Sequence, residues 1–409
     1  MTDKYDKLCS LPSETYLKLC GKLKKLPATM KIKSCSYSEI EFEIHDYSIL
    51  AEVDKDKPIV LVDANNIDEI SQSKNKKYVF LDTKLNNRSF ELRTPLNNCI
   101  FKMNSLITNT FRNFLIDKNF IEIQTPKLIG TASEGGSHVF KLDYFGKKAY
   151  LAQSPQLYKQ MLINADFEKV FEIGPVFRAE ESNTTRHLCE FTGLDVEMEI
   201  PEEQTYGYVI DILWQMLDSI FTTLKNKTEE YNYIKSITNF TDLVYPTEPR
   251  IIHFCDAVEL LNLHDFKQNE LEDLSTQNEK QLGIMMKKIY DTDLFVIDQY
   301  PTNVRPFYTM PFNENLDSKY SNSYDVIMRG EEISSGAQRI HKYSLLMDSL
   351  NKKKLDPDNF KAYIESFAYG SKKHGGYGLG LNRILMLFFE LKDVRRATLF
   401  PRDPTRITP

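Results

Sequence analysis

The sequence predicts an α+β fold, because two different patterns of apolar residues indicate both strands and helices. Apolar residues alternate along 170–179 and again along 194–198, which indicates two β-strands joined by a loop. Apolar residues recur instead at helical spacing along 100–115 and 208–221. Strand-like runs return within 294–338, after a mostly helical region.

The composition is that of an ordinary globular protein. The chain has 409 residues, long enough for two or three domains, of which 41% are hydrophobic and 27% charged. The formal net charge of -6 argues against a protein whose whole surface is basic, although local patches can still bind a nucleic acid.

The six cysteines form no C-x-x-C pair and show no repeated metal spacing, so we expect reduced thiols. No apolar run approaches the length of a transmembrane helix, and the first ten residues lack a signal-peptide core. A cytoplasmic protein with no membrane partner is predicted.

The two strands at 170–199 carry an unusual set of polar residues. Arg178 and Glu180 share one face of the first strand. The connecting segment 181–187 is longer than a tight turn needs and suits a polyanion, whereas the alternative is a solvated hairpin. One face of the second strand carries an aromatic ring and three carboxylates: Phe191, Asp195, Glu197 and Glu199.

The run Phe177-Arg178-Ala179-Glu180, followed by Arg186-His187 and Phe191, resembles motif 2 of the class II aminoacyl-tRNA synthetases. FRAEESNTTRH followed by EFTGLDVEME is similar to the aspartyl-tRNA synthetases of the archaeal and eukaryotic kind. The resemblance implies that Arg178 bridges the α-phosphate of ATP and the substrate carboxylate, because a fixed cation must offset the repulsion of two anions. Phe191 would stack on adenine.

The resemblance extends to the other two class motifs. Residues 100–126 resemble motif 1, which implies a homodimer, and the run HGGYGLGLNRILMLFFELKDVRRATLFPRDP resembles motif 3. Arg383 lies at the start of a helix, where a cation is unfavourable by about 0.3 to 1 kcal/mol unless an anion such as the γ-phosphate of ATP answers it. The family usually carries Glu or Asp just before this arginine, whereas this chain has Asn382, which keeps hydrogen bonding and lacks the charge.

The resemblance assigns further residues to ATP, Mg²⁺, L-aspartate and tRNA. Carboxylate and hydroxyl oxygens suit Mg²⁺, which shares phosphate oxygens, and the expected ligands are Glu332 and Ser335. ATP is expected to meet Arg178, Glu180, Arg186, His187, Phe191, Glu332 and Arg383, with Arg178 and Arg383 catalytic. Aspartate is expected to meet Glu134, Gln156, Lys159, Asp195, Ser335 and Arg339. The acceptor end of the tRNA is expected to meet Ser182, Asn183 and Thr184.

The resemblance also divides the chain into domains. Residues 99–409 are expected to form the class II catalytic domain, an antiparallel sheet with flanking helices, and the polar segment 64–98 a hinge. Short β-like runs in 1–63, the last of them PIVLVD, resemble the final part of an OB barrel that reads the anticodon. The first barrel strands have no counterpart, so a partial OB-like domain with weak anticodon discrimination is expected.

The function implied is ATP-dependent ligation of L-aspartate to tRNA(Asp) through an aspartyl-adenylate. An asparaginyl enzyme is disfavoured by FPRD at 400–403 and RPFYTMP at 305–311, which look aspartyl. An adenylate-forming asparagine synthetase would need no anticodon reader, but the loop SNTTRH resembles one that meets tRNA. A non-catalytic adaptor would not need to keep Arg178 and Arg383.

Overall fold

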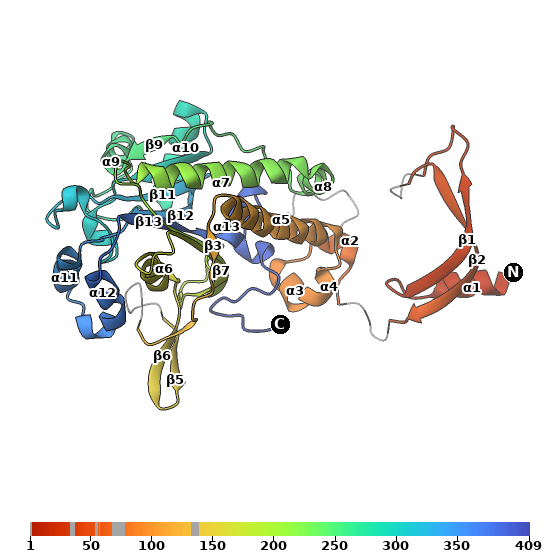
Figure 1. The fold of residues 1–409 in the computed structure, drawn as a ribbon. Coiled ribbons are helices and arrows are strands. Elements are labelled where there is room, and N and C mark those ends of the chain that lie inside the picture. The colour runs from red at the N-terminus through yellow and green to blue at the C-terminus, as the bar shows by residue number, and fades with distance from the viewer. Residues whose placement is uncertain (1, 33–36, 54–55, 57, 68–77, 132–138) are drawn as a thin grey trace. The chain divides into compact units, whose positions relative to one another are not determined.

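The computed structural model describes residues 2–32, 37–53, 56, 58–67, 78–131 and 139–409. These fall into two compact units, Met1–Val60 and Leu61–Pro409 (Figure 1). No helix in these ranges is long and apolar enough to cross a membrane.

The smaller unit contains a helix and a two-stranded sheet. Helix α1 (Thr2–Ser10) precedes strands β1 (Tyr16–Lys25) and β2 (Ile40–Ala51), which pair antiparallel. A Cβ at Gly21 would lie 2.0 Å from the carbonyl oxygen of Glu43, so only glycine permits the close approach at this irregular point of the ladder. The strand predicted from Ile40, Phe42 and Ile44 is present, but these side chains are 39 to 42% exposed rather than half-buried in a core, because no further strand covers them among the described residues.

The structure differs from the predicted hinge at 64–98. The run PIVLVD is not a strand but ends in helix α2 (Leu61–Ala64), and α3 (Leu81–Asn86) and α4 (Arg88–Glu91) follow. Arg88 is 2% exposed and donates to the carbonyl oxygens of Leu399 and Thr398 over 2.8 and 2.6 Å. These contacts make 78–98 part of the larger unit, whereas the polar composition suggested a solvated linker. Residues 68–77 lie outside the described ranges.

An eight-stranded sheet organises the larger unit. Its strands pair antiparallel except at the two edges, where β3 pairs parallel with β7 and β9 parallel with β10. The predicted antiparallel sheet is therefore confirmed in its interior. In spatial order the strands are β3 (Ile121–Glu122), β7 (Lys169–Phe177), β8 (Glu190–Glu199), β13 (His374–Gly380), β12 (Glu331–Gln338), β11 (Ser323–Met328), β10 (Leu294–Asp298) and β9 (Ile251–His253).

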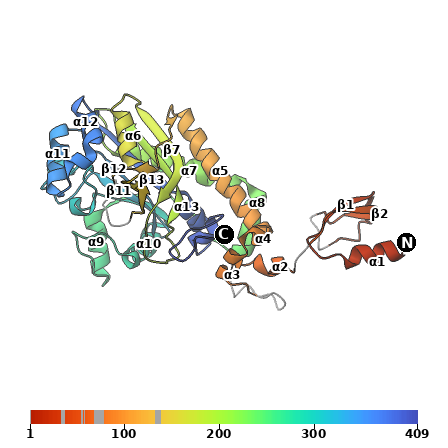
Figure 2. The same ribbon diagram turned by 90° about the horizontal axis from the view of Figure 1, so that it is seen from below.

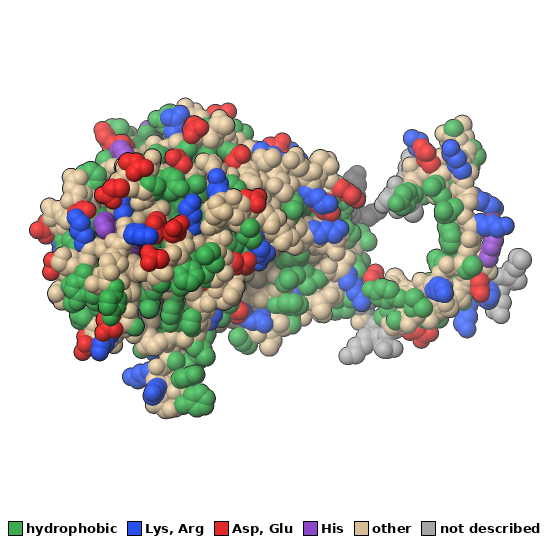
Figure 3. Space-filling model, in the orientation of Figure 1, with side chains coloured by type: hydrophobic (Ala, Val, Ile, Leu, Met, Phe, Trp, Pro, Cys, Tyr) green, Lys and Arg blue, Asp and Glu red, His purple; other side chains and the backbone are tan. Residues whose placement is uncertain are grey.

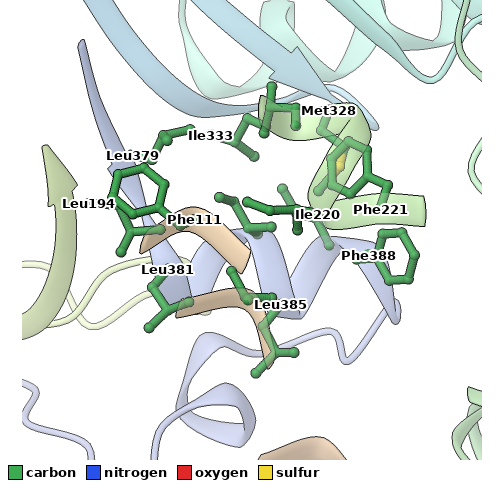
Figure 4. Packing of buried hydrophobic residues seen from close by; sticks show 14 of the residues in the cluster. Phe111, Leu194, Ile220, Phe221, Met328, Ile333, Leu379, Leu381, Leu385 and Phe388 are labelled. Carbon is green, nitrogen blue, oxygen red and sulfur yellow. The ribbon is translucent and has the colours of Figure 1, made fainter. Parts of the chain in front are cut away.

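Long helices bury one face of this sheet. Helix α5 (Pro95–Asp117) runs beside α7 (Gly207–Asn226) in Figure 1, with α8 (Thr228–Thr238) and α13 (Leu381–Phe388) completing the layer. Thr94 caps α5 by accepting from the backbone N–H of Asn97, and proline fits at the first helical position. In Figure 4, Phe111 of α5 lies among Leu194, Leu379 and Leu381, which joins helices and strands in one core.

The remaining helices lie around the other parts of the sheet. Figure 2 shows α9 (Phe254–Leu263) and α10 (Thr276–Tyr290) side by side. Their apolar residues form one buried cluster with those of β10 and β11. A second cluster joins α6 (Gln156–Ile163), α11 (Tyr343–Lys352) and α12 (Lys361–Ala368). A three-stranded sheet has the order β4 (Leu128–Ile129), β6 (Lys147–Leu151), β5 (Lys141–Tyr144). The 3-10 turns in the described part of the chain are η1 (Thr302–Val304), η2 (Phe312–Glu314), η3 (Pro357–Phe360) and η4 (Val394–Ala397).

Charges of both signs are interspersed over the visible face of the larger unit in Figure 3, as the near balance of 52 basic and 58 acidic residues leads one to expect.

Candidate active site

A cavity of about 320 Å³ opens over strands β8, β12 and β13 and the loop after β7, which is a size suited to a small-molecule substrate. The structure brings together most of the residues that the sequence assigned to substrates. Those lining the cavity are Gln156, Arg178, Glu180, Arg186, His187, Phe191, Asp195, Glu332, Ser335, Arg339 and Arg383.

Arg339 lines one end of this cavity, and the completely buried Lys159 lies next to the lining residue Asp195. Lys159 donates from Nζ to Oδ1 of Asp195 over 3.0 Å, and Nζ lies 3.6 Å from Oε2 of Glu197. Arg339 donates from Nε to Oε1 of Glu197 over 2.9 Å and from Nη2 to Oε1 of Gln156 over 3.2 Å. Helix α6 thus supplies Lys159 and Gln156, β8 supplies the two carboxylates, and Arg339 directly follows the end of β12.

Glu197 is the central residue of this network and was not assigned a role from the sequence. Burial by itself would raise the pKa of Glu197, but the charges of Arg339 and Lys159 outweigh burial and lower that pKa below its usual value. The alternation that placed Glu197 on the same strand face as Asp195 was a signal that could have identified it.

Glycine at position 376 makes room for the Glu197 carboxylate. A Cβ on Gly376 of β13 would lie 2.4 Å from Oε2 of Glu197 and 2.1 Å from the carbonyl oxygen of Val196. The glycine-rich run before α13 is therefore a strand that packs closely on β8, rather than a loose loop.

Arg178 and Phe191 meet at the other end of the cavity. The guanidinium carbon of Arg178 lies 5.6 Å from the centroid of the Phe191 ring, within the range of a cation–π contact. Strands β7 and β8 pair antiparallel up to Phe177 and Glu190. This pairing sets the distance between Arg178, which follows β7, and Phe191 of β8. The sequence correctly placed these two side chains on one surface.

Arg383 connects two segments of the cavity wall. It donates from Nη1 to the carbonyl oxygen of Glu332 over 2.8 Å and from Nη2 to the carbonyl oxygen of Arg186 over 3.2 Å. His187 lies next to this contact, with Nδ1 2.7 Å from Oγ1 of Thr184. Burial and the positive charge of Arg383 lower the pKa of His187.

Arg186 is bound to helix α10, a contact that the sequence did not indicate. Its Nη1 donates to Oε2 of Glu279 over 2.9 Å, and its Nη2 donates to the hydroxyl of Thr276. Burial, and secondly the charge of Glu332, raises the pKa of Glu279 to about 7. Arg186 lines the cavity, but its guanidinium is held by side chains of α10, which lies outside the segment that resembles motif 2.

The residues expected to bind Mg²⁺ lie beside another carboxylate, Asp325. Burial raises the pKa of Glu332, and the charge of Asp325 raises it further. Asp325 pairs with Arg305 over 2.7 Å, but its buried Oδ1 has no hydrogen-bond partner within the structure, and Arg305 also donates to Oγ of Ser335 over 3.2 Å. A divalent cation would relieve the repulsion of the two carboxylates, so this residue set fits Mg²⁺.

The described ranges contain no group of three or more His, Cys, Asp or Glu side chains able to hold a metal ion by themselves.

The loop residues predicted to meet tRNA are open to solvent. Ser182 and Asn183 are exposed, Thr184 is half-buried, and Asn183 donates to Oγ1 of Thr405 over 3.5 Å. Glu134, expected to meet aspartate, lies outside the described residues.

Asn382, the departure from the motif 3 pattern, is fully used in hydrogen bonding. Its Nδ2 donates to the carbonyl oxygen of Ala397 over 2.9 Å and to Oγ1 of Thr398 over 3.0 Å. Its Oδ1 accepts from the backbone N–H of Thr192 over 3.3 Å. Two of the three bonds need an amide donor, which a carboxylate lacks.

Comparison with known proteins gives a consistent match over nearly the whole chain. A family model described as tRNA synthetases class II (D, K and N) matches residues 81–404. The cytoplasmic aspartate-tRNA ligase of Mus musculus is 44% identical over 407 residues, which cover 98% of this chain and 79% of the mouse protein. The cytoplasmic aspartate-tRNA ligase 1 of Arabidopsis thaliana is 43% identical over 91% of this chain and 70% of its own length.

Solved structures agree with these relatives. The aspartyl-tRNA synthetase of Entamoeba histolytica superposes with a TM-score of 0.87 at 38% identity, over 98% of this chain and 80% of that one. The asparaginyl-tRNA synthetase of Pyrococcus horikoshii complexed with asparaginyl-adenylate superposes with a TM-score of 0.84 at 26% identity, over 100% of this chain and 87% of that one.

Proposed function

The chain belongs to the class II tRNA synthetases, within them to the aspartate-tRNA ligases, and we propose that it joins L-aspartate to tRNA(Asp) with ATP through an aspartyl-adenylate. The relatives that support this proposal are named cytoplasmic enzymes, in agreement with the predicted compartment.

The observation that best supports this proposal is the arrangement of positively charged side chains at the cavity. Arg339 and Asp195 line one end of the cavity, the buried Lys159 donates to Asp195, and Arg178 faces the cavity near Phe191. The two buried cations would receive the side-chain carboxylate of aspartate, while Asp195 would accept from its ammonium group. Both cations offer only hydrogen-bond donors, and the side-chain NH₂ group of asparagine would face them with another donor in place of an acceptor, which favours aspartate.

The proposed first step requires that the two substrates be positioned and that their negative charges be offset. No side chain forms a covalent bond with either substrate. The substrate α-carboxylate attacks the α-phosphorus of ATP in line, the bond to the bridging oxygen breaks, and pyrophosphate leaves. Arg178 would hold the carboxylate and the α-phosphate together with its planar guanidinium, and Phe191 would stack on adenine. Glu180 would orient the adenine end, while Arg383 and His187 would face the departing phosphates.

Glu332 and Ser335, with Asp325 beside them, would hold Mg²⁺, which supplies positive charge to the phosphate oxygens when bound. In the second step, the 3′-hydroxyl of the terminal adenosine attacks the adenylate carbonyl, and AMP leaves. Ser182, Asn183 and Thr184 are exposed or half-buried at the rim and would meet the acceptor end.

A homodimer is part of the proposal. Ile116 of α5 and Ile121 of β3 are 50 and 48% exposed, and β3 is an edge strand whose outer side lacks a partner strand in the described structure. An uncovered edge with apolar side chains is suited to pairing with a second copy. Sedimentation equilibrium would test it.

Amino-acid-dependent pyrophosphate exchange tests the proposed function. We expect exchange with aspartate and at least 100-fold less with asparagine at equal concentration, because each lost hydrogen bond to a buried cation costs about 1.5 to 3 kcal/mol. Preference for asparagine would overturn the substrate assignment. Exchange without transfer to tRNA, together with formation of asparagine from ammonia, would favour the synthetase alternative, and a folded protein without any exchange would favour the adaptor.

A further inference from the structure

Arg186 stands in a loop assigned to ATP, yet its guanidinium is held by a helix that no substrate role involves. Glu279 and Arg186 form an ion pair with side chains only 13 and 18% exposed. The hydroxyl of Thr276, one turn earlier on α10, accepts from the second terminal nitrogen of the same guanidinium. A guanidinium whose two terminal nitrogens both donate hydrogen bonds is held in one orientation.

Helix α10 is itself firmly seated on the sheet. Gly283 lies against Gly330 in the turn between β11 and β12, where a Cβ on Gly283 would be 2.5 Å from the Cα of Gly330. Gly330 has a φ of +77°, and a Cβ there would lie 2.9 Å from the Cα of Lys280. Backbone contacts this close leave α10 little freedom to slide along the turn that precedes Glu332.

The start of α10 is fixed as well. Ser275 caps the helix by accepting from the backbone N–H of Asn278 over 3.1 Å. The buried amide of Asn278 donates to the carbonyl oxygen of Lys267 over 3.1 Å and to Oε1 of Gln268 over 2.8 Å. Glu279 therefore projects from a rigid first turn, and its position can determine that of the loop.

The backbone of Arg186 is hydrogen-bonded to a residue that lines the cavity, so the position of Arg186 affects the cavity. Its carbonyl oxygen accepts from Nη2 of Arg383, whose Nη1 donates to the carbonyl oxygen of Glu332. His187 is the next residue. Moving Arg186 would thus move both groups that face the triphosphate end.

We propose that Glu279, with Thr276, anchors the loop 181–188 through the side chain of Arg186, so that Arg186 positions His187 and Arg383 and does not bind phosphate with its own guanidinium. Glu279 is then a positioning residue for adenylate formation, and this role rests on the proposed function. It also revises the role expected for Arg186 from the sequence.

A double-mutant cycle of Glu279→Ala and Arg186→Ala separates an anchor from a phosphate ligand. Because hydrogen bonds to charged groups contribute a factor of about 10 to 100, each variant should raise the KM for ATP by that amount in aspartate-dependent exchange. The double variant should be no worse than either single one. Glu279→Gln, which keeps an acceptor, should show a smaller effect, and Glu259→Ala on the exposed side of α9 is the matched control.

Hydrogen–deuterium exchange supplies a readout that needs no activity. Without substrates, the backbone amides of residues 181–188 should exchange at least several-fold faster in both single variants and the double variant, while those of α10 stay unchanged. Unchanged exchange of the loop overturns the anchor. So does a KM for ATP that falls in Glu279→Ala, or a double variant much worse than Arg186→Ala. If the wild-type protein shows no aspartate-dependent activity while the loop still responds, the proposed function fails and the anchor stands.

Discussion

Arg339 donates from Nε to Oε1 of Glu197 over 2.9 Å, and both side chains are almost completely buried. Lys159 lies 3.6 Å from the other oxygen of the same carboxylate. The two cations proposed to select aspartate are therefore held by a carboxylate that does not belong to the substrate. Their direction is set before any ligand arrives, so less ordering is needed when it binds.

Glu197→Gln should weaken the use of aspartate. The glutamine amide can accept one hydrogen bond from Arg339, but its NH₂ group would face Lys159, so the two cations lose their common anchor. We expect kcat/KM for aspartate to fall about 10- to 100-fold in pyrophosphate exchange, the range for hydrogen bonds to charged groups. The KM for ATP should change little.

The matched control is Glu199→Gln on the same strand. Glu199 pairs with Lys372 over 2.7 Å and does not line the cavity. An aspartate kcat/KM in Glu197→Gln equal to that of this control would show that the anchor has no part in substrate selection.

The sequence predicted the parts of the site that follow from local pattern. Phe191 lies on β8 and Arg178 directly follows the neighbouring strand β7, two strands whose alternation is visible in the sequence, and the buried α13 follows from its apolar run. Glu279 and Asp325 could not be found in this way, because their roles depend on how α10 and β11 pack against distant segments. The same limit explains the predicted hinge: nothing near Arg88 in sequence shows that its partners are Thr398 and Leu399.

Arg178→Lys should abolish most adenylate formation without unfolding the protein. An ammonium group cannot bridge a carboxylate and a phosphate as a planar guanidinium does, so we expect kcat in aspartate-dependent exchange to fall about 100- to 1,000-fold. Arg93→Lys is the control, because Arg93 is also exposed and stacks on an aromatic ring, with 5.4 Å from its guanidinium carbon to the centroid of Phe90. Near-normal exchange in a folded Arg178→Lys protein would refute the assignment.

Asn382→Asp should destabilise the larger unit at neutral pH. The substitution keeps the size of the side chain but removes the donor to the carbonyl oxygen of Ala397, and it brings a negative charge against that oxygen. The expected loss is about 1 to 3 kcal/mol of unfolding free energy, seen as a lower thermal midpoint by circular dichroism. Asn359→Asp at an exposed position is the control. Equal midpoints for the two variants would mean that the amide of Asn382 is dispensable.

His374 should make the protein sensitive to mild acid. The residue is fully buried, and its Nδ1 lies 2.7 Å from the carbonyl oxygen of Lys372. Burial lowers the pKa of His374 to about 4, against the opposing charge of Glu197. Since the unfolded chain binds this proton near pH 6.5 and the folded chain does not, stability is lost as pH falls from about 6.5 to about 4, by about 3 kcal/mol in total.

His374→Gln should therefore flatten the pH dependence of stability, whatever its effect on stability at pH 7.5. Between pH 7.5 and pH 5, we expect the unfolding free energy of the wild-type protein to fall by about 2 kcal/mol more than that of His374→Gln, because the unfolded state of the variant has no imidazole to protonate at this position. Urea unfolding followed by the fluorescence of Trp214, the single tryptophan, measures both. His264→Gln, at an exposed position after α9, should retain the wild-type slope. Parallel curves for the wild-type protein and His374→Gln would show that the buried imidazole is protonated as readily in the folded state as in the unfolded one.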